Sequence, residues 1–443
     1  MPGVNPSNRR LRRANNLTEY GVASGGFGFG IPSRIGTSYH GFRLFNRVKS
    51  ECCKRPEPII TEIWKLFQTL TTAVGDTEFG KSVAISQNGE FIAVIAQDTL
   101  YPDQAALATN GRKGKVHIFK LRTNATGYDE VDTHTPSADH MRIGANGLAS
   151  EISISDDGHT IIYSEKNTNT NTGSGIVLKK NANDDLFQVL HKLEGTNADG
   201  GAEVAISGNA DRVAVASFAS KDIQLFKLNG GNGQYEKEGG TISNANAAIS
   251  TFGQSIAFNT DGTRLAVGTS NGVYILGNTG AGGAWAVISE FLGDAGTLGQ
   301  GYGDRVDISG DASIVVVSHS GEDNGNVIVI KKDPNNLPQY IIDTTIKADL
   351  NNEISSIAIS KDGTKIIIGN RGYDTPANNS GVAVVYKLDL GDWEIDDKKL
   401  YGDAADQFGK DVDISADGNI IIVGTPDAPN NTDNGYVRIY KFH

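Results

Sequence analysis

Short runs of β-branched residues, separated by tight turns, recur along the chain. The unit is a run such as VAIS, a turn, and a second run such as FIAVIA, and it is written seven times. Successive copies are 69, 52, 52, 50, 51 and 55 residues apart, beginning at Val83, Ile152, Val204, Ile256, Val306, Ile357 and Val412. Two runs joined by a turn predict a β-hairpin, and a period near 50 residues predicts a repeat architecture.

The residues between and after these runs fit the same interpretation. The turn is Asn-Gly or Asp-Gly in five copies and Asn209-Ala210 or Asp311-Ala312 in the other two, pairs that tolerate positive φ. A third run follows each hairpin and is usually opened by glycine, as at Gly114. A fourth run begins at an aromatic residue: Tyr128, Phe187, Tyr235, Trp285, Tyr340 and Trp393.

Four antiparallel strands, repeated seven times, predict an all-β fold, a seven-bladed β-propeller over residues 59–443. The last copy stops at His443, after its third strand, and a spare strand at residues 63–71 precedes the first copy. We expect this spare strand, which contains Trp64, to be the outer strand of the last blade. That placement closes the ring and covers an exposed edge.

Four copies carry an aromatic-glycine pair just before the hairpin: Phe79-Gly80, Phe252-Gly253, Tyr302-Gly303 and Phe408-Gly409. With the last copy, FGKDVDISADGNIIIVGTPDAPNNTDNGYVRIYKF, they resemble the FG-GAP repeats of integrin α-chain propellers and of bacterial and algal surface proteins. The resemblance spans about residues 63–443. It implies the fold and no particular activity.

Integrin-type blades often bind calcium through an acidic loop, and the resemblance raises that question here. Asp413, Ser415 and Asp417 alone begin the pattern and are the candidate metal ligands, but its ninth position is the aliphatic Ile421. Calcium requires six or more oxygens. We therefore predict neither a bound metal nor another cofactor.

The charge is divided unevenly between two parts of the 443-residue chain, whose net charge is -12. Residues 1–58 hold ten Lys and Arg against three Glu, a net of +7, whereas the remainder holds 30 basic and 49 acidic residues, a net of -19. We interpret residues 1–58 as a basic arm that precedes the propeller. Its predicted anchoring residues are Arg9, Arg10, Arg12, Arg13, Arg34, Arg43 and Arg47.

The arm interleaves glycine, aromatic residues and arginine, as in RRLRR and SGGFGFGIPSRIGTSYHGFRLFNR. Such a segment suits an extended chain that folds on an acidic or phosphate-bearing partner, and single-stranded nucleic acid is an alternative partner. The arm is also similar to the N-termini of structural proteins from large algal DNA viruses, which carry FG-GAP-like propellers. That resemblance implies a capsid tether.

Patterns for catalysis are missing or belong to the repeat. The segment Gly75 to Ser82 matches the phosphate-loop pattern GxxxxGK[ST], but a strand is expected after it where phosphate binding needs a helix. No GxSxG elbow is present, and the two cysteines, Cys52 and Cys53, are neighbours, which excludes a disulfide framework. We predict no catalytic residues. Asp307 and Asp413 are the side chains that a channel-site enzyme would use.

Recognition is therefore expected on loops. The connections 97–113, 370–380 and 425–434 should share one face, with Tyr101, Arg371, Tyr373, Asp374 and Asp427 as binding residues.

We expect a non-enzymatic structural or protein-interaction propeller, held by its arm in a larger assembly, with a virion as the location. An adhesion or glycan-binding propeller is the alternative, and a channel-site hydrolase or lyase the third. Neither a signal peptide nor an apolar run long enough for a transmembrane helix is found in the sequence, so otherwise a cell-surface or cytoplasmic location follows.

Overall fold

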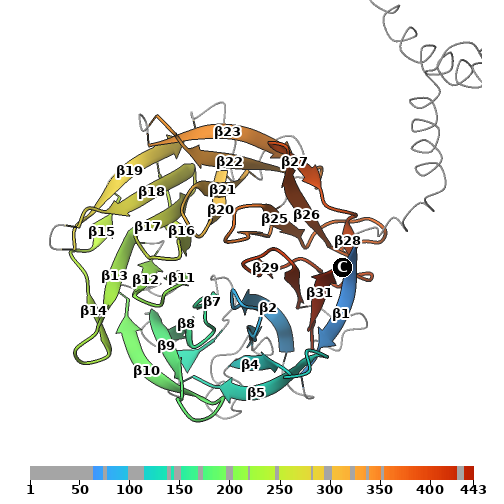
Figure 1. Ribbon diagram of the computed structural model, residues 1–443, viewed down its shortest axis with the longest axis horizontal. Coiled ribbons are helices and arrows are strands. Elements are labelled where there is room, and N and C mark those ends of the chain that lie inside the picture. Colours follow the sequence, from blue (N-terminus) through green and yellow to red (C-terminus); the bar gives the residue numbers. More distant parts are fainter. Residues whose placement is uncertain are drawn as a thin grey trace, which may run out of the picture. The chain divides into compact units, whose positions relative to one another are not determined.

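A computed structural model of the chain shows a closed ring of β-sheets (Figure 1). It describes residues 63–72, 77–97, 114–136, 141–143, 151–167, 173–195, 203–217, 220–244, 249–280, 283–293, 302–319, 325–335, 339–350, 354–426 and 434–443. The predicted arm, residues 1–58, lies outside them. Within the described ranges, no helix is long and apolar enough to cross a membrane.

Seven antiparallel sheets, each built on four strands, form the blades of a propeller, as the sequence predicted. Blade 1 is β2 (Thr77–Ile85), β3 (Phe91–Gln97), β4 (Lys115–Leu121) and β5 (Tyr128–His134). Blade 2 is β7 (Ile152–Ile154), β8 (Thr160–Asn167), β9 (Gly173–Lys180) and β10 (Phe187–Glu194), with β6 (Met141–Arg142) beside β8. Blade 3 is β11 (Glu203–Ile206), β12 (Arg212–Ser217), β13 (Asp222–Asn229) and β14 (Gln234–Lys237), with β15 (Ile242–Ser243) beside β13.

The remaining blades repeat this plan. Blade 4 is β16 (Phe252–Phe258), β17 (Arg264–Thr269), β18 (Gly272–Asn278) and β19 (Trp285–Leu292). Blade 5 is β20 (Tyr302–Ile308), β21 (Ile314–His319), β22 (Asn326–Lys332) and β23 (Tyr340–Lys347). Blade 6 is β24 (Ser356–Ile359), β25 (Lys365–Asn370), β26 (Val382–Asp389) and β27 (Asp392–Ile395), with β28 (Leu400–Tyr401) beside β26. Blade 7 is β29 (Val412–Ile414), β30 (Ile420–Thr425), β31 (Tyr436–Phe442) and β1 (Trp64–Leu70).

The ring is closed by strands from the two ends of the propeller, which confirms the predicted role of residues 63–71. β1 pairs antiparallel with β31, from Trp64 opposite Phe442 to Leu70 opposite Val437. The two strands lie side by side at the right of Figure 1. Trp64 is buried and packs against the Phe442 ring, with a centroid distance of 5.2 Å. An aromatic residue at its start therefore anchors the closing strand by packing, as aromatic residues do at the start of the outer strands of other blades.

Several of the aromatic residues at the start of an outer strand make the same hydrogen bond within their own blade. The Tyr128, Tyr235 and Tyr340 hydroxyls donate to the carbonyl oxygens of Gly89, Ala210 and Ala312 at 2.6, 2.6 and 2.8 Å. Each accepting carbonyl belongs to the turn between the first two strands. The outer strand is thus tied to the inner hairpin of its blade.

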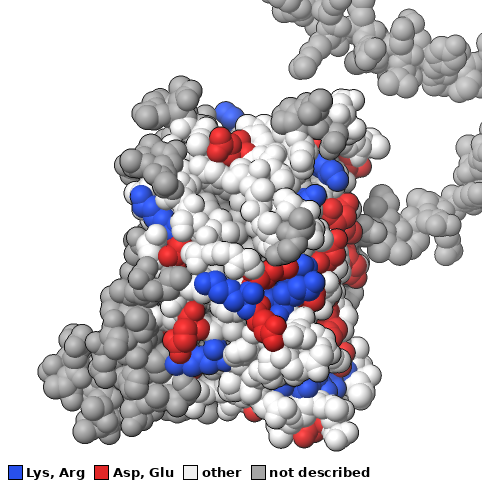
Figure 2. Space-filling view, turned by 90° about the vertical axis from the view of Figure 1, so that its left-hand side faces the viewer, with Lys and Arg blue, Asp and Glu red and all other residues white. Residues whose placement is uncertain are grey.

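Each seam between neighbouring blades has its own apolar core, so that the seven blades share seven clusters. The seam between blades 4 and 5, for example, contains Val273 and Ile275 from one side and Val315 and Val317 from the other. The side of the ring seen in Figure 2 has Lys and Arg side chains interspersed with Asp and Glu.

The aromatic-glycine pairs pack into these seams at the end of the ring where the inner strands begin. Phe79, Tyr302 and Phe408 are completely buried, and the glycine that follows each presses its backbone against the preceding blade. Gly303 has φ +96°, and a Cβ there would overlap the carbonyl oxygen of Gly272 and lie 2.8 Å from that of Thr269. The pair is therefore explained by close packing of backbones.

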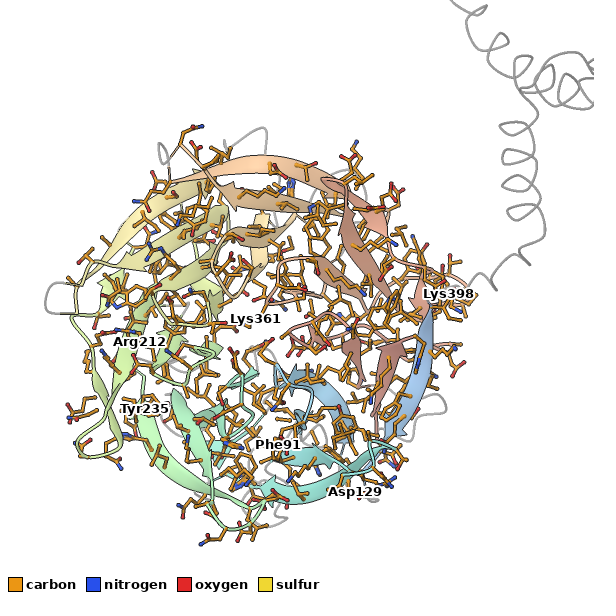
Figure 3. All side chains as sticks on the ribbon, viewed as in Figure 1. Phe91, Asp129, Arg212, Tyr235, Lys361 and Lys398 are labelled. Carbon is orange, nitrogen blue, oxygen red and sulfur yellow. The ribbon has the colours of Figure 1, made fainter. Side chains whose placement is uncertain are left out.

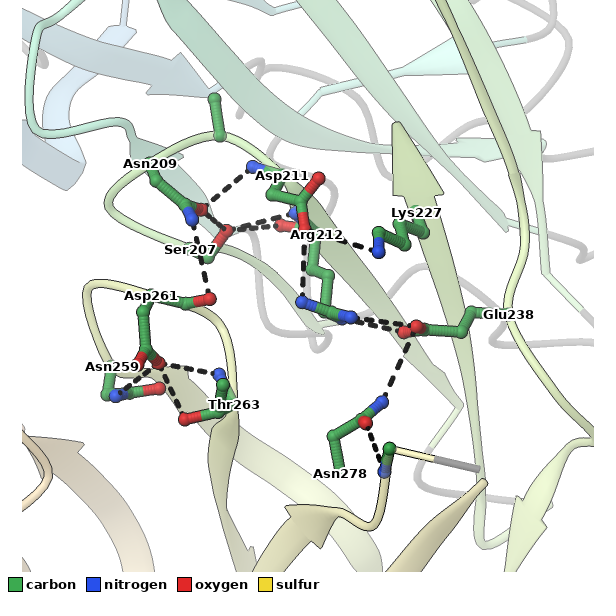
Figure 4. Close-up of polar contacts among 12 residues, drawn as sticks. Ser207, Asn209, Asp211, Arg212, Lys227, Glu238, Asn259, Asp261, Thr263 and Asn278 are labelled. Carbon is green, nitrogen blue, oxygen red and sulfur yellow. Dashed lines mark hydrogen bonds and ion pairs between the residues drawn. The ribbon is translucent and has the colours of Figure 1, made fainter. Parts of the chain in front are cut away.

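A buried ion pair within blade 3 is joined to blade 4 by two hydrogen bonds to its carboxylate (Figure 4). Arg212 donates through Nε and Nη2 to the two oxygens of Glu238, at 2.7 and 2.9 Å. Trp285 Nε1 donates to the same carboxylate at 3.2 Å, and Asn278 Nδ2 at 3.4 Å. Both charges are removed from water, so each depends on its partner.

We predict that Gly303→Ala destabilises the ring by more than about 2 kcal/mol, because positive φ and a backbone overlap are both penalised. Gly233→Ala is the matched control. It has φ +71° but open space where a side chain would extend, so about 1 kcal/mol is expected. Urea unfolding of both variants measures the difference, and equal losses would contradict the packing explanation.

We predict that Glu238→Gln costs about 2–3 kcal/mol, because Arg212 loses its buried partner and keeps only the ion pair of its Nη1 with Asp211, at 3.0 Å. Asp129→Asn at the exposed Arg122–Asp129 pair is the control and should have a much smaller effect on stability, because water and salt screen an exposed ion pair. The joint replacement Arg212→Met with Glu238→Leu should recover most of the loss in denaturant melts. A single Glu238→Gln variant as stable as the parent would show that the pair is not a structural tie.

Candidate functional site

The two ends of the ring carry different connections. Each inner strand, such as β24, runs into a tight turn that leads to the second strand of its blade. We call the end with these turns the turn face, and the end where inner strands begin the loop face. Since strands alternate in direction, the connection from second to third strand leaves at the loop face. β3, β25 and β30, which precede the three predicted binding loops, all end there.

The turn face carries seven copies of one hydrogen-bonded turn. In blade 7, Ser415 Oγ donates to Asp417 Oδ1 (2.7 Å) and accepts from the Ile420 N–H (3.0 Å), while Asp417 Oδ1 also accepts from the Asn419 N–H (3.0 Å). Figure 4 shows the equivalent turns of blades 3 and 4, at Ser207–Asn209 and Asn259–Asp261. Backbone hydrogen bonds link successive turns around the axis at every seam of the described residues except that between blades 1 and 2.

Asp413 and Asp307, the predicted channel carboxylates, join neighbouring blades. Asp413 accepts from the Ile85 N–H across the closing seam and from its neighbour Ile414, both at 2.8 Å. Asp307 accepts in the same way from Ile359 and Ile308. Burial first, and the nearby Asp307, raise the pKa of Asp413 to about 7 in spite of these hydrogen bonds.

The candidate metal ligands Asp413, Ser415 and Asp417 thus all have protein partners. Within the described ranges, no group of three or more His, Cys, Asp or Glu side chains is arranged to hold a metal ion.

The loop-face end of the axis has a different character. One residue of each blade, directly before the buried Val or Ile of the inner strand, contributes to a ring of side chains. We call this the axial ring, and its members are Ser82, Glu151, Glu203, Ser255, Arg305, Ser356 and Asp411. Ser255 and Ser356 accept hydrogen bonds from the next blade at Val306 and Val412, and Asp411 accepts one from Val83 (2.8 Å).

All members of the axial ring except Ser82 line a cavity of about 190 Å³ between the inner strands. At its loop-face end the cavity is lined by Lys81, Glu151, Glu203, Arg305, Lys410 and Asp411. Lys361 comes from a hairpin turn at the other end, and Figure 3 shows it near the centre of the ring. Both signs of charge therefore meet in a small enclosed space.

The pKa values in this group are displaced by burial and by mutual interaction. Burial and the charge of Asp411 raise the pKa of Glu203 to about 8, although Arg305 opposes the shift. Burial, and the charges of Glu203 and Asp411, raise the pKa of Glu151 well above its usual range, although Arg305 and Lys410 oppose the shift. Burial, together with Arg371, Arg305 and Lys81, lowers the pKa of Lys410 to about 8. Near neutral pH Glu203 is thus mostly protonated, and Lys410 is mostly charged.

The connection 371–380, the predicted binding loop of blade 6, is described in full. Tyr373 stacks on Tyr401 with ring centroids 6.2 Å apart, and Lys399 Nζ lies 5.4 Å from the Tyr373 centroid. Asp374 Oδ1 accepts from the Asn379 N–H (2.9 Å), and so shapes the loop. Arg371 lies close enough to Lys410 to lower its pKa, which places it beside the cavity mouth. Tyr101 and Asp427 lie outside the described residues.

The segment that matches a phosphate-loop pattern is part of the inner strand of blade 1. β2 runs through Gly80, Lys81 and Ser82, so a strand follows, as predicted, and Lys81 Nζ binds Glu78 Oε2 at 2.9 Å. His134 Nε2 lies 3.2 Å from Asp132 Oδ2 in the outer strand.

Glu151 and Glu203 are absent from the site residues predicted from the sequence. Each occupies a repeat position held by serine in Ser82, Ser255 and Ser356. Comparing the seven copies column by column at this position would have marked the charged members.

Comparisons with known proteins identify the fold. No protein-family model matches the chain, and no curated protein does. Similar solved structures include the periplasmic gluconolactonase of Pseudomonas aeruginosa, at 14% identity and TM-score 0.50, over 73% of this chain and 85% of that one. The Cps50 (Swd1) β-propeller domain of Myceliophteria thermophila is 12% identical with TM-score 0.55, over 84% and 99%. A protein from Lactobacillus plantarum is 15% identical with TM-score 0.52, over 80% and 92%. At these identities the likeness shows the propeller fold alone.

We predict that Glu203→Gln flattens the pH dependence of stability. Between pH about 4.5 and 8, folded Glu203 holds a proton that the unfolded chain has released, so stability falls as pH rises through this window. Glutamine removes this contribution, and the fall from pH 5 to 8 should shrink by more than about 1 kcal/mol. Denaturant melts at several pH values measure it, with the exposed Glu394→Gln as the matched control. An unchanged slope in Glu203→Gln would contradict the assignment.

Proposed function

We propose that this protein is a non-enzymatic interaction propeller, which binds a partner with its loop face and is held in a larger assembly by its basic arm. The assembly proposed from the arm is a virion, in which the protein is capsid-associated. The observation that carries the proposal is the asymmetry of the ring. One face carries seven copies of the same short turn, and the other carries the longer connections and the charged axial ring.

The described part of the loop face offers contacts suited to a protein partner. Tyr373 and Tyr401 form a stacked pair beside Lys399, and Tyr401 is 37% exposed. Tyrosine supplies a large contact area with a polar tip and is enriched at protein interfaces. The rigid ring below holds these side chains in place.

The dimensions of the axial cavity favour binding over turnover of a large substrate. Pockets for drug-sized ligands span about 300–1,000 Å³, whereas this cavity measures about 190 Å³. Asp307 and Asp413, which a channel enzyme would use, and the nearby Asp411 accept hydrogen bonds from backbone amides. Their lone pairs are thereby engaged in holding blades together.

The aromatic-glycine pairs that resemble FG-GAP repeats support adhesion or glycan binding as the second candidate. Both functions place recognition on the loop face. They differ in the arm, which an adhesion module does not need for binding. Variants of the arm can therefore distinguish the two functions.

We predict that the full-length protein co-sediments with particles purified from its source, and that replacing Arg9, Arg10, Arg12 and Arg13 by Gln weakens this at least tenfold. The reason is that the arm carries the net positive charge, so the loss should be greatest at low salt. If the arm variant sediments as the parent does, the anchor is wrong and the adhesion function takes its place.

A second pair of variants separates the two faces. Tyr401→Thr at the loop face should weaken capture of the partner, whereas Leu186→Thr, an equally small change at an exposed turn-face residue, should not. Equal effects of both variants would contradict a binding role for the loop face.

A further inference from the structure

The axial cavity contains a buried polar atom that the protein itself leaves unpartnered. Glu203 is 4% exposed, and its Oε2 has no hydrogen-bond partner. Glu151, Arg305 and Lys410 line the same cavity and are half-buried. A buried polar atom without a partner is costly, so the Glu203 Oε2 atom in a cavity beside these charged side chains indicates a ligand or ordered water.

The positions of these groups around the ring divide the cavity into two sectors. Glu151 and Glu203 come from the adjacent blades 2 and 3, whereas Arg305 and Lys410 come from blades 5 and 7. Arg305 is held by its Nε, which donates to the Ser355 carbonyl oxygen at 2.7 Å. A ligand in the cavity would therefore meet cations on one side and carboxyl groups on the other.

At neutral pH these groups act together as donors. The protonated Glu203 carboxyl group donates through its O–H, the Lys410 ammonium group also donates, and Arg305 adds a fixed positive charge. Asp411 does not compete as a free anion, because its oxygens accept from Val83, Val412 and Ser356. Donors and positive charge converging on one small space fit an oxyanion and repel a cation.

We infer that the axial cavity binds one small oxyanion, a carboxylate or a tetrahedral phosphate or sulfate group, between Arg305 and Lys410 on one side and Glu151 and Glu203 on the other. This site is separate from the arm and from the tyrosine pair, and goes beyond the proposed function. The volume agrees with it. A water occupies about 30 Å³ in the liquid, so about 190 Å³ holds such a group with a few further atoms or waters.

Binding at this site is linked to protons. An anion favours the charged form of Lys410 and the neutral form of Glu203, and both groups gain protons as pH falls through about 8. Burial also raises the pKa of Glu151. The other charged groups that line the cavity or lie beside Lys410 are Lys81, Arg305, Lys361, Arg371, Asp307, Asp411 and Asp413. Affinity should therefore rise as pH falls from 9 to 6.

Isothermal titration of the full-length protein tests the inference with three probes: sulfate, acetate and methylammonium. Sulfate and acetate keep their charge from pH 6 to 9, so a pH dependence reports on the protein. We expect sulfate or acetate to bind and methylammonium not to bind, with affinity about tenfold higher at pH 6.5 than at pH 8.5. The preferred anion distinguishes a tetrahedral from a planar ligand.

Two substitutions locate the site. Lys410→Met should weaken the anion at least tenfold, and Lys398→Met, the same change at the exposed periphery labelled in Figure 3, should leave it unchanged. Glu203→Gln keeps a neutral side chain, so it should retain binding and lose part of the pH dependence. Thermal melts confirm that each variant is folded.

Three results would overturn the inference. They are binding of methylammonium in place of the anions, equal anion affinity in Lys410→Met and the parent, and no binding of any probe at millimolar concentration. The last result assigns the cavity to ordered water. None of them bears on the arm, whose role is decided by sedimentation.

Discussion

The structure depends on how the backbone amides of its inner strands are satisfied near the axis. Each blade is a separate sheet, so an inner strand has a hydrogen-bonded neighbour on one side only. The amides on its other edge face the axis, and those that are buried need other acceptors. Side chains of the preceding blade supply these at Asp411, Asp413 and Asp307, and turn carbonyls supply them at the turn face.

This requirement gives the seams unequal character. The closing seam between blades 7 and 1 receives Asp411, Asp413 and a backbone bond from Ala416 to Gln87. In the described residues, the seam between blades 1 and 2 has no comparable axial bond, and is held by packing such as that of Phe91 against Phe187. The closing seam, made by strands distant in sequence, is thus joined like the seam between blades 5 and 6, where Ile359 donates to Asp307, Gly310 to Lys361 and Arg305 to Ser355.

The repeat made most of the fold predictable from the sequence. Asn-Gly and Asp-Gly pairs, aromatic starts and the spare strand each have local causes, and all appear as predicted, with Ala210 and Ala312 at positive φ in the two turns that lack glycine. The site was harder to predict. In the sequence, Asp413 resembles a metal ligand, and only the structure shows its hydrogen bonds across the seam. The surroundings of Glu151 and Glu203 are formed by blades that come together only in the closed ring.

The pairing of β1 with β31 has a mechanical consequence. If residues 1–58 tether the protein, any pulling force enters the ring at Trp64, where β1 begins opposite Phe442. The load then falls on one outer strand, held by its hydrogen bonds to β31 and by the Trp64 side chain against Phe442 and Lys365. β1, the strand that completes the ring, would thus also bear the tension. Its detachment would leave the ring open, with a free strand edge.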